Sequence, residues 1–200
     1  MGTGILLSGG IDSAALARWK QPDVALTINY GQRSALGEIR AAKKITEELS
    51  IAHEVVSVDL QHLGSGDLAG TPPSSLAPAP EWWPFRNQML ATIAAMRAIA
   101  LGIDTLLFGA VATDNVHADG RPAFFALLDQ LTSMQEGGIR VSAPAIGMTT
   151  LELVRCSGID LHVLAWCHSC HTADFACGNC RGCFKYESIM YALEREYGFH

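Results

Sequence analysis

The stretch GILLSGGIDSAALARW, from Gly4 to Trp19, constrains the fold more than any other part of the sequence. Its apolar beginning, Gly4–Leu7, predicts a buried β-strand, and the spacing of apolar residues in Asp12–Lys20 predicts a helix. The adjacent glycines between them permit a tight turn in which backbone N–H groups converge. A strand, a glycine turn and a helix N-terminus in this order are typical of a loop that holds phosphate.

The rest of the chain continues this alternation of strands and helices. Near-continuous apolar strands between helices predict an α/β fold, a doubly wound parallel sheet covered on both faces. A loop rich in Gly, Pro and Ser, residues 64–84, has the length that is typical of a lid or of a disordered segment. The predicted strands are Gly4–Leu7, Val24–Tyr30, Ala52–Val58, Thr105–Ala110 and Arg140–Ser142, and the predicted helices are Asp12–Lys20, Leu36–Leu49, Gln88–Leu101, Phe124–Gln135 and Thr149–Cys156.

Length and composition limit the classes of function. A chain of 200 residues can build one domain with a substantial core, and we expect an α/β domain at 1–160 and a C-terminal segment with a final helix at 161–200. The net charge of −6 argues against broad nucleic-acid binding, which needs a basic face. No apolar run approaches the roughly 18 residues of a membrane span, and no secretion signal is recognisable. A cytoplasmic location without a membrane partner is therefore expected.

Four of the six cysteines crowd into residues 170–183. Cys177, Cys180 and Cys183 follow a C-x-x-C-x-x-C pattern that presents three thiolates on a tight turn. Four such ligands with no open position are typical of structural zinc. Reduced cysteines packed in a core are the alternative, but the Gly, Asn and Arg residues around them disfavour it. The candidates for the fourth ligand are Cys170, Cys167, His168 and His171.

The glycine loop is expected where a doubly wound sheet binds ligands, at the carboxyl end of the first strand. Ser8 and Ser13 add hydroxyl donors to the backbone N–H groups of Gly9 and Gly10. Asp12 can cap the helix that follows, but beside a phosphate its charge requires a cation such as Mg²⁺. The alternative is a simple turn in which Asp12 is only a cap.

Several blocks of sequence together resemble one family. The string SGGIDS, Ser8–Ser13, is similar to the SGGxDS loop of the PP-loop ATP pyrophosphatases. The other blocks resemble those of the 7-cyano-7-deazaguanine synthases, the QueC family, and they occur in the family's order over nearly the whole chain. These blocks are Asn29–Arg33 with Glu38, Pro84–Asn87, Phe108–Gly109 with Thr113–Asp114, Ser169–His171, and Cys177–Cys183.

The resemblance implies roles for particular residues. Asp12 would act through Mg²⁺, and Arg86, which otherwise would be taken for a surface residue at the end of the loop, would hold phosphate oxygens through its guanidinium. Asp114 would complete the catalytic set. ATP would lie over Leu7, Ser8, Gly9, Gly10, Ile11, Asp12 and Ser13, with Gln32 and Arg33 nearby, and Zn²⁺ would be bound by Cys170, Cys177, Cys180 and Cys183.

The resemblance also implies a reaction. A carboxylate, 7-carboxy-7-deazaguanine by analogy, attacks the α-phosphorus of ATP and pyrophosphate leaves, after which an amine attacks the acyl-adenylate to form an amide. Family members use ammonia and activate the amide again to form the nitrile. Two alternatives stay open: transfer of the activated deazaguanine to an amine on a partner protein, and a non-catalytic nucleotide-binding subunit. A homodimer is also expected.

The chain departs from the family at three places. Residues 115–121 stand where the family has GYPDC, although Asp119 and Arg121 could take the positions of the family's Asp and Arg. Thr150 stands where the family's LTKAE block has lysine, and losing that ammonium removes charge that would stabilise departing pyrophosphate. His171 replaces a tyrosine. We therefore expect the ATP scaffold to be kept, the acceptor side to be altered, and little or no free nitrile to form.

Overall fold

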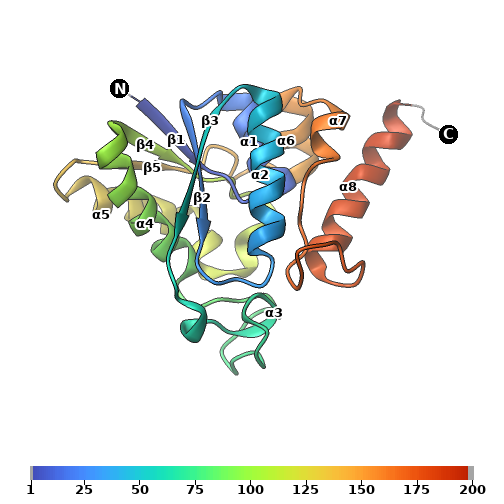
Figure 1. Cartoon of the computed structure of the whole chain (residues 1–200), viewed down its shortest axis with the longest axis horizontal. Helices are drawn as coiled ribbons and strands as arrows, with labels where there is room; N and C mark the ends of the chain where they lie inside the picture. The colour runs from blue at the N-terminus through green and yellow to red at the C-terminus, as the bar shows by residue number, and fades with distance from the viewer. Residues whose placement is uncertain (1, 198–200) are drawn as a thin grey trace.

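The computed structural model, which describes residues 2–197, contains a five-stranded sheet in the order β3-β2-β1-β4-β5. All neighbouring strands are parallel, and helices cover both faces of the sheet (Figure 1). This confirms the predicted α/β fold with a doubly wound parallel sheet. The strands are β1 (Gly2–Leu6), β2 (Val24–Asn29), β3 (Ala52–Ser57), β4 (Ile103–Leu107) and β5 (Arg140–Ser142).

The helices divide between two hydrophobic clusters, one on each face of the sheet. Residues of α1, α2, α6, α7 and α8 share the first cluster, and residues of α3, α4 and α5 share the second. The helices are α1 (Ile11–Lys20), α2 (Ala35–Leu49), α3 (Gly66–Ala69), α4 (Arg86–Leu101), α5 (Pro122–Ser133), α6 (Thr150–Ser157), α7 (Leu161–Leu164) and α8 (Arg181–Tyr197), and the 3-10 turns are η1 (Gln61–Leu63), η2 (Ala112–Val116) and η3 (Ala118–Gly120).

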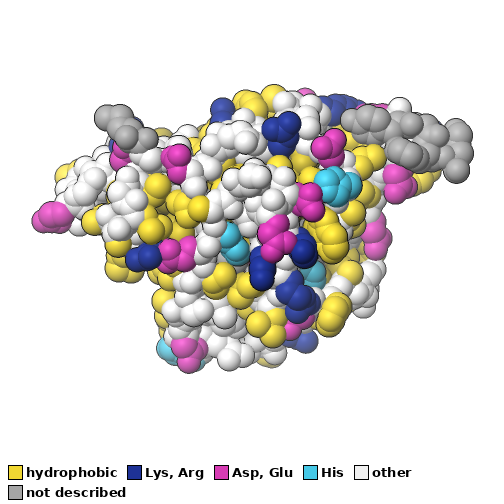
Figure 2. All heavy atoms as spheres, turned by 45° about the horizontal axis from the view of Figure 1, so that its top comes forward, with side chains coloured by type: hydrophobic (Ala, Val, Ile, Leu, Met, Phe, Trp, Pro, Cys, Tyr) yellow, Lys and Arg dark blue, Asp and Glu magenta, His cyan; other side chains and the backbone are white. Residues whose placement is uncertain are grey.

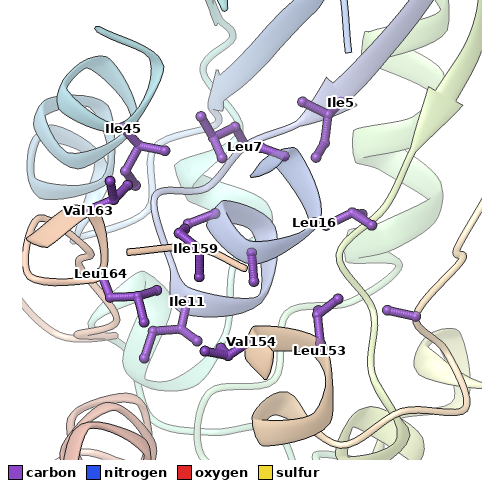
Figure 3. Packing of buried hydrophobic residues seen from close by; sticks show 14 of the residues in the cluster. Ile5, Leu7, Ile11, Leu16, Ile45, Leu153, Val154, Ile159, Val163 and Leu164 are labelled. Atoms are coloured by element: carbon purple, nitrogen blue, oxygen red, sulfur yellow. The ribbon is translucent and has the colours of Figure 1, made fainter. Parts of the chain in front are cut away.

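Helix α1 packs closely because its buried face is built largely from alanine. Ala14, Ala15 and Ala17 are fully buried, and such short side chains let a helix approach its neighbours closely. Around α1 the first cluster is completed by leucines from distant elements, including Leu153 of α6 and Leu164 of α7 (Figure 3). Leu164 belongs to the predicted C-terminal segment, so this segment packs on the same core as the α/β domain. The division at residue 160 stays a prediction.

Two short helices were not expected from the sequence. Helix α3 lies inside the predicted loop at 64–84, and α7 precedes the cysteine cluster. Each is a single turn, which is too short to show helical periodicity. The loop itself is anchored by Trp83, which is 2% exposed and packs edge-on against Tyr30 with the ring centroids 4.8 Å apart.

The surface shown in Figure 2 intersperses basic and acidic side chains. It therefore offers a nucleic acid no continuous positive face on that side of the molecule. Within residues 2–197, no helix combines the length and the apolar character that crossing a bilayer requires.

Candidate active site

A cavity of about 700 Å³ lies at the carboxyl ends of β1 and β4. Helix α1 follows β1 and packs on one face, whereas α5 follows β4 and packs on the other, so the cavity occupies the switch point of the sheet. Its walls come from the loop before α1, the start of α4, the turn η2, the start of α6 and the first turns of α8. The predicted site residues that line it are Leu7, Ser8, Gly10, Ile11, Asp12, Ser13, Arg86, Asp114 and the predicted zinc ligand Cys170.

The turn between β1 and α1 gathers its hydroxyl groups on the cavity side. The Oγ atoms of Ser8 and Ser13 lie 3.3 Å apart, and the Ser13 hydroxyl donates to the Gly10 carbonyl at 3.0 Å. Because the residue at the N-cap of α1 is Gly10, no side chain caps this helix. Its first N–H groups are therefore left for a ligand, which is the arrangement that binds phosphate.

Gly9 lies in the same turn but is not among the residues that line the cavity. Its φ of +77° is in the left-handed region, and a Cβ atom there would lie 2.8 Å from the Glu38 carbonyl oxygen and from Ala41 Cβ. The Gly9 carbonyl accepts a hydrogen bond from the His168 N–H at 2.8 Å. Gly9 thus lets the loop pack tightly against α2 and the cysteine-bearing segment, and does not itself face the cavity.

The Gly9→Ala variant should consequently lower the free energy of unfolding by about 2–4 kcal/mol, because both the backbone strain and the steric overlap are unfavourable. Urea denaturation measures this loss. Gly147→Ala is the matched control, since nothing lies within 4 Å of a Cβ atom placed there. If the two variants were equally stable, the inference that Gly9 is needed for tight packing of the loop would be wrong.

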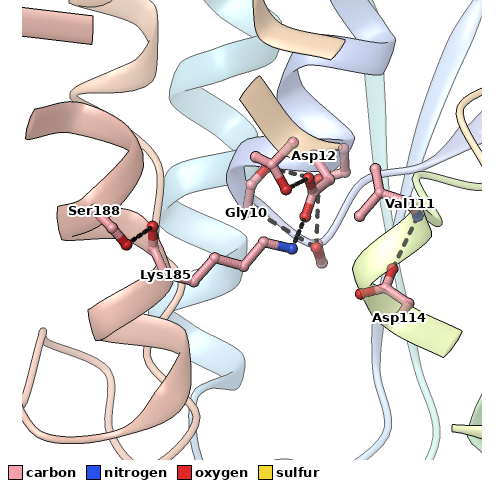
Figure 4. A network of polar contacts seen from close by, with 9 residues as sticks. Gly10, Asp12, Val111, Asp114, Lys185 and Ser188 are labelled. Atoms are coloured by element: carbon pink, nitrogen blue, oxygen red, sulfur yellow. Dashed lines mark hydrogen bonds and ion pairs between the residues drawn. The ribbon is translucent and has the colours of Figure 1, made fainter. Parts of the chain in front are cut away.

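Asp12, on the first turn of α1, is held by side chains from two distant helices (Figure 4). Its Oδ1 accepts a hydrogen bond from Thr150 Oγ1 at 2.7 Å, and its Oδ2 lies 2.6 Å from Lys185 Nζ. Thr150 begins α6, whereas Lys185 lies in α8, just after the cysteine cluster. The ammonium that the sequence lacks at Thr150 is therefore supplied beside the same carboxylate by Lys185.

Asp114 adds a second carboxylate to the same part of the cavity. It lies on η2, where its Oδ2 accepts a hydrogen bond from the Val111 N–H at 3.0 Å. Burial raises the pKa of Asp114, and the nearby charge of Lys185 opposes this rise. Two carboxylates and one ammonium are thus close enough to influence one another at the cavity wall.

Arg86 is the first residue of α4 and also lines the cavity. Its positive charge lies near Tyr30 and Glu38: burial raises the pKa of both groups, and Arg86 opposes the rise in both. The Arg86 guanidinium is therefore an inward-facing charge and not a surface residue of the loop.

Gln32 and Arg33, which the resemblance places near ATP, do not line the cavity. Gln32 is buried, and its amide Nε2 donates to Glu38 Oε2 at 2.9 Å. Arg33 is exposed, and its side chain lies against Gly70. Gln32 thus holds Glu38, which does line the cavity, and a nucleotide contact of Gln32 or Arg33 stays a prediction.

The segment that departs from the family is fastened to the start of α4. Asp119 Oδ2 accepts from the Asn87 N–H at 3.0 Å, and the Asn87 amide donates to the Asp119 carbonyl at 2.8 Å. Arg121 donates to the Asn115 carbonyl at 3.2 Å. Asp119 therefore satisfies a helix N–H group that lacks an intrahelical partner.

The four predicted cysteine ligands converge after α7. The sulfurs of Cys170, Cys177, Cys180 and Cys183 all lie within 4.8 Å of one another, and a zinc–sulfur tetrahedron with bonds of about 2.3 Å has edges of roughly 3.8 Å. The backbone N–H groups of His171 and Cys183 both point at Cys180 Sγ from 3.4 Å. Such donors stabilise a thiolate. The cluster can therefore hold one metal ion.

The other candidate ligands are directed elsewhere. Cys167 packs against the first hydrophobic cluster, where burial raises the pKa of its thiol to about 12. His168 Nε2 lies 3.0 Å from the Ala173 carbonyl oxygen. Neither these two residues nor His171 belongs to the converging group of ligand atoms.

The sequence did not indicate an ionic cluster that also lines the cavity. Glu81, from the loop before α4, is only 7% exposed, and its Oε1 accepts from Arg181 Nη1 at 2.7 Å and lies 3.4 Å from His117 Nε2. Burial alone would raise the pKa of Glu81, but the contacts with His117 and Arg181 bring it to about 2. Glu81 is therefore ionised. Neither spacing nor motif connects these three residues, so no sequence signal indicated the cluster.

The fold and this cavity together define the class of protein. A doubly wound sheet with the SGGIDS loop at the N-terminus of α1, facing carboxylates and cations in one cavity, is a nucleotide-binding domain of the PP-loop type. The family model described as queuosine biosynthesis protein QueC matches residues 4–188. The chain belongs to the QueC family and is an ATP-dependent enzyme of that type.

Relatives outside this chain agree with that assignment. The 7-cyano-7-deazaguanine synthase of Ralstonia pickettii (strain 12J) is 34% identical, over 90% of this chain and 89% of that protein. The protein of the same name from Xanthomonas campestris pv. campestris (strain B100) is 30% identical, over 90% and 88%. Among solved structures, the U34-tRNA thiolase NcsA of Methanococcus maripaludis shares the fold, with a TM-score of 0.54 at 19% identity, over 98% of this chain and 66% of that one.

Proposed function

We propose that this protein is an ATP-dependent C–N ligase that activates the carboxylate of a 7-deazapurine, which by analogy with the family is 7-carboxy-7-deazaguanine. The observation that carries the proposal is the contact of Asp12 with Lys185 and Thr150 beside an uncapped α1 N-terminus. Carboxylates, an ammonium and free helix N–H groups around one cavity form a set that suits a magnesium-bound polyphosphate.

The donor sets fit the two metals that the family implies. Asp12 and Asp114 offer hard carboxylate oxygens on the wall that carries the phosphate loop, which suits Mg²⁺. Bound there, Mg²⁺ would neutralise charge on the phosphates. Cys170, Cys177, Cys180 and Cys183 offer four soft thiolates with no open position, which suits structural Zn²⁺.

In the proposed reaction an oxygen of the substrate carboxylate attacks the α-phosphorus of ATP, and the bond to the leaving pyrophosphate breaks. The N–H groups of α1 and the Ser8 and Ser13 hydroxyls hold phosphate oxygens, and Arg86 balances negative charge that moves onto the leaving group. An amine then attacks the acyl carbon, loses a proton and expels AMP, which leaves an amide. Ammonia is the simplest amine, and a partner protein's amine is the second candidate.

A non-catalytic nucleotide-binding subunit is disfavoured by the position of Lys185. The missing lysine at Thr150 would favour such a subunit, but the ammonium of Lys185 lies 2.6 Å from Asp12 Oδ2. The charge that catalysis requires is therefore present, although it comes from another helix.

Incubation with ATP, Mg²⁺, ammonium and 7-carboxy-7-deazaguanine tests the proposal. We expect pyrophosphate release that depends on the acid, and 7-deazaguanine without the carboxyl group is the matched control. The mass of the product separates amide from nitrile and both from a protein-linked product when a candidate partner is added. Release no greater than with ATP alone would contradict the proposed activity.

A further inference from the structure

Lys185 lines the cavity and belongs to none of the motifs that the sequence shows. It lies two residues after Cys183, in the first turns of α8, and its side chain crosses to the loop of α1 (Figure 4). The side chain is 34% exposed, whereas the Asp12 carboxylate that it meets is 19% exposed. The Lys185 side chain thus lines the cavity and is partly exposed, and its ammonium is held by a carboxylate.

The position of this ammonium is fixed from both ends of the side chain. At the cavity end, Asp12 Oδ2 lies 2.6 Å from Nζ. At the backbone end, the start of α8 is tied to the cysteine cluster, because Cys183 lies in the helix and its N–H points at Cys180 Sγ at 3.4 Å. The cysteine cluster therefore determines where α8 begins and where its lysine reaches.

Lys185 is not the only donor that holds the Asp12 carboxylate, because Thr150 Oγ1 donates to Oδ1 at 2.7 Å. An ammonium beside a helix N-terminus, on a side chain that lines the same cavity as Ser8 and Ser13, matches an anion with several oxygens better than a single carboxylate. The geometry points to Lys185 as a phosphate-contacting residue of the nucleotide site, delivered by the helix that the cysteine cluster anchors. This inference rests on the proposed function and adds a residue to it.

Two roles for Lys185, neutralising Asp12 or contacting phosphate, predict opposite effects of its removal on nucleotide affinity. If Lys185 only neutralises Asp12, it occupies the place of a cation, and removing it would leave Mg²⁺-nucleotide binding unchanged or tighter. If it contacts phosphate, removing it weakens binding, because a charge-assisted hydrogen bond is lost. The two roles therefore differ in the sign of one measurable quantity.

Calorimetric titration with Mg²⁺ and α,β-methylene-ATP, which cannot release pyrophosphate, measures that quantity directly. Lys185→Met should weaken binding about 10-fold or more, whereas Lys185→Arg, which keeps the charge, should stay within a few-fold of the parent. Lys44→Met is the matched control, because Lys44 forms its ion pair with Glu47 on the exposed surface of α2.

Equal or tighter binding by Lys185→Met would overturn the inference and leave the proposed function standing. Failure of the unmutated protein to bind the analogue would instead overturn the proposed function itself. Thermal melting of each variant distinguishes a structural role: a large fall in the melting temperature with nucleotide affinity unchanged would also overturn the inference.

Discussion

The Asp12→Asn variant is expected to release pyrophosphate about 10² to 10³ times more slowly than the unmutated enzyme while keeping its fold. The substitution keeps the shape of the side chain and the acceptor for Thr150, whose hydroxyl lies 2.7 Å from Oδ1. It removes the negative charge that faces Lys185 and that would hold Mg²⁺. The rate of pyrophosphate release, with a circular dichroism melt of the same sample, measures the effect.

The matched control makes the same chemical change at the amino ends of the strands, away from the cavity. Asp23 precedes β2, is exposed, and accepts a hydrogen bond from the Thr3 N–H at 2.7 Å. Asp23→Asn should leave the rate within a few-fold of the parent. An Asp12→Asn enzyme as active as the parent, or an Asp23→Asn enzyme as impaired as Asp12→Asn, would refute the role given to Asp12.

Cys180→Ser is expected to abolish binding of one zinc ion per chain and to lower the melting temperature by on the order of 10 °C or more. Cys180 is 6% exposed and accepts backbone N–H groups from both sides of the cluster. The substitution removes a thiolate ligand. The two backbone N–H groups then face the serine oxygen, which is a harder and smaller atom than sulfur. Elemental analysis of the purified protein and a thermal melt measure the two effects.

Cys156→Ser is the control for this experiment. Cys156 is exposed on α6 and lies outside the converging sulfurs. The Cys156→Ser variant should keep the full zinc content and the melting temperature of the parent. Full zinc retention in Cys180→Ser, or an unmutated protein without zinc, would show that the assignment of the cluster is wrong.

The elements that the sequence predicted well are those whose side chains carry a local period. Burial leaves a local pattern of apolar residues in three of these elements. They are the run before SGGIDS, the helical spacing of Leu36–Leu49 and the run at Thr105–Ala110, where the structure has β1, α2 and β4. The spacing of Cys177, Cys180 and Cys183 is likewise local, because a short turn fixes the distance between thiolates. Predicted strand ends shifted by a few residues, since the pattern of apolar residues does not specify where pairing stops.

The sequence by itself thus determined the α/β class, the phosphate loop and the cysteine cluster, because each depends on residues near one another in the chain. Only the tertiary structure decided which distant side chains complete the site. Lys185 contacts Asp12, from which it is separated by 173 positions in the sequence. Arg181 contacts Glu81, from which it is separated by 100 positions. Only the structure shows that Gln32 is hydrogen-bonded to Glu38 and that Arg33 lies against Gly70; a nucleotide contact of either residue stays a prediction. Such pairings follow from where helices pack on the sheet, and no local pattern encodes them.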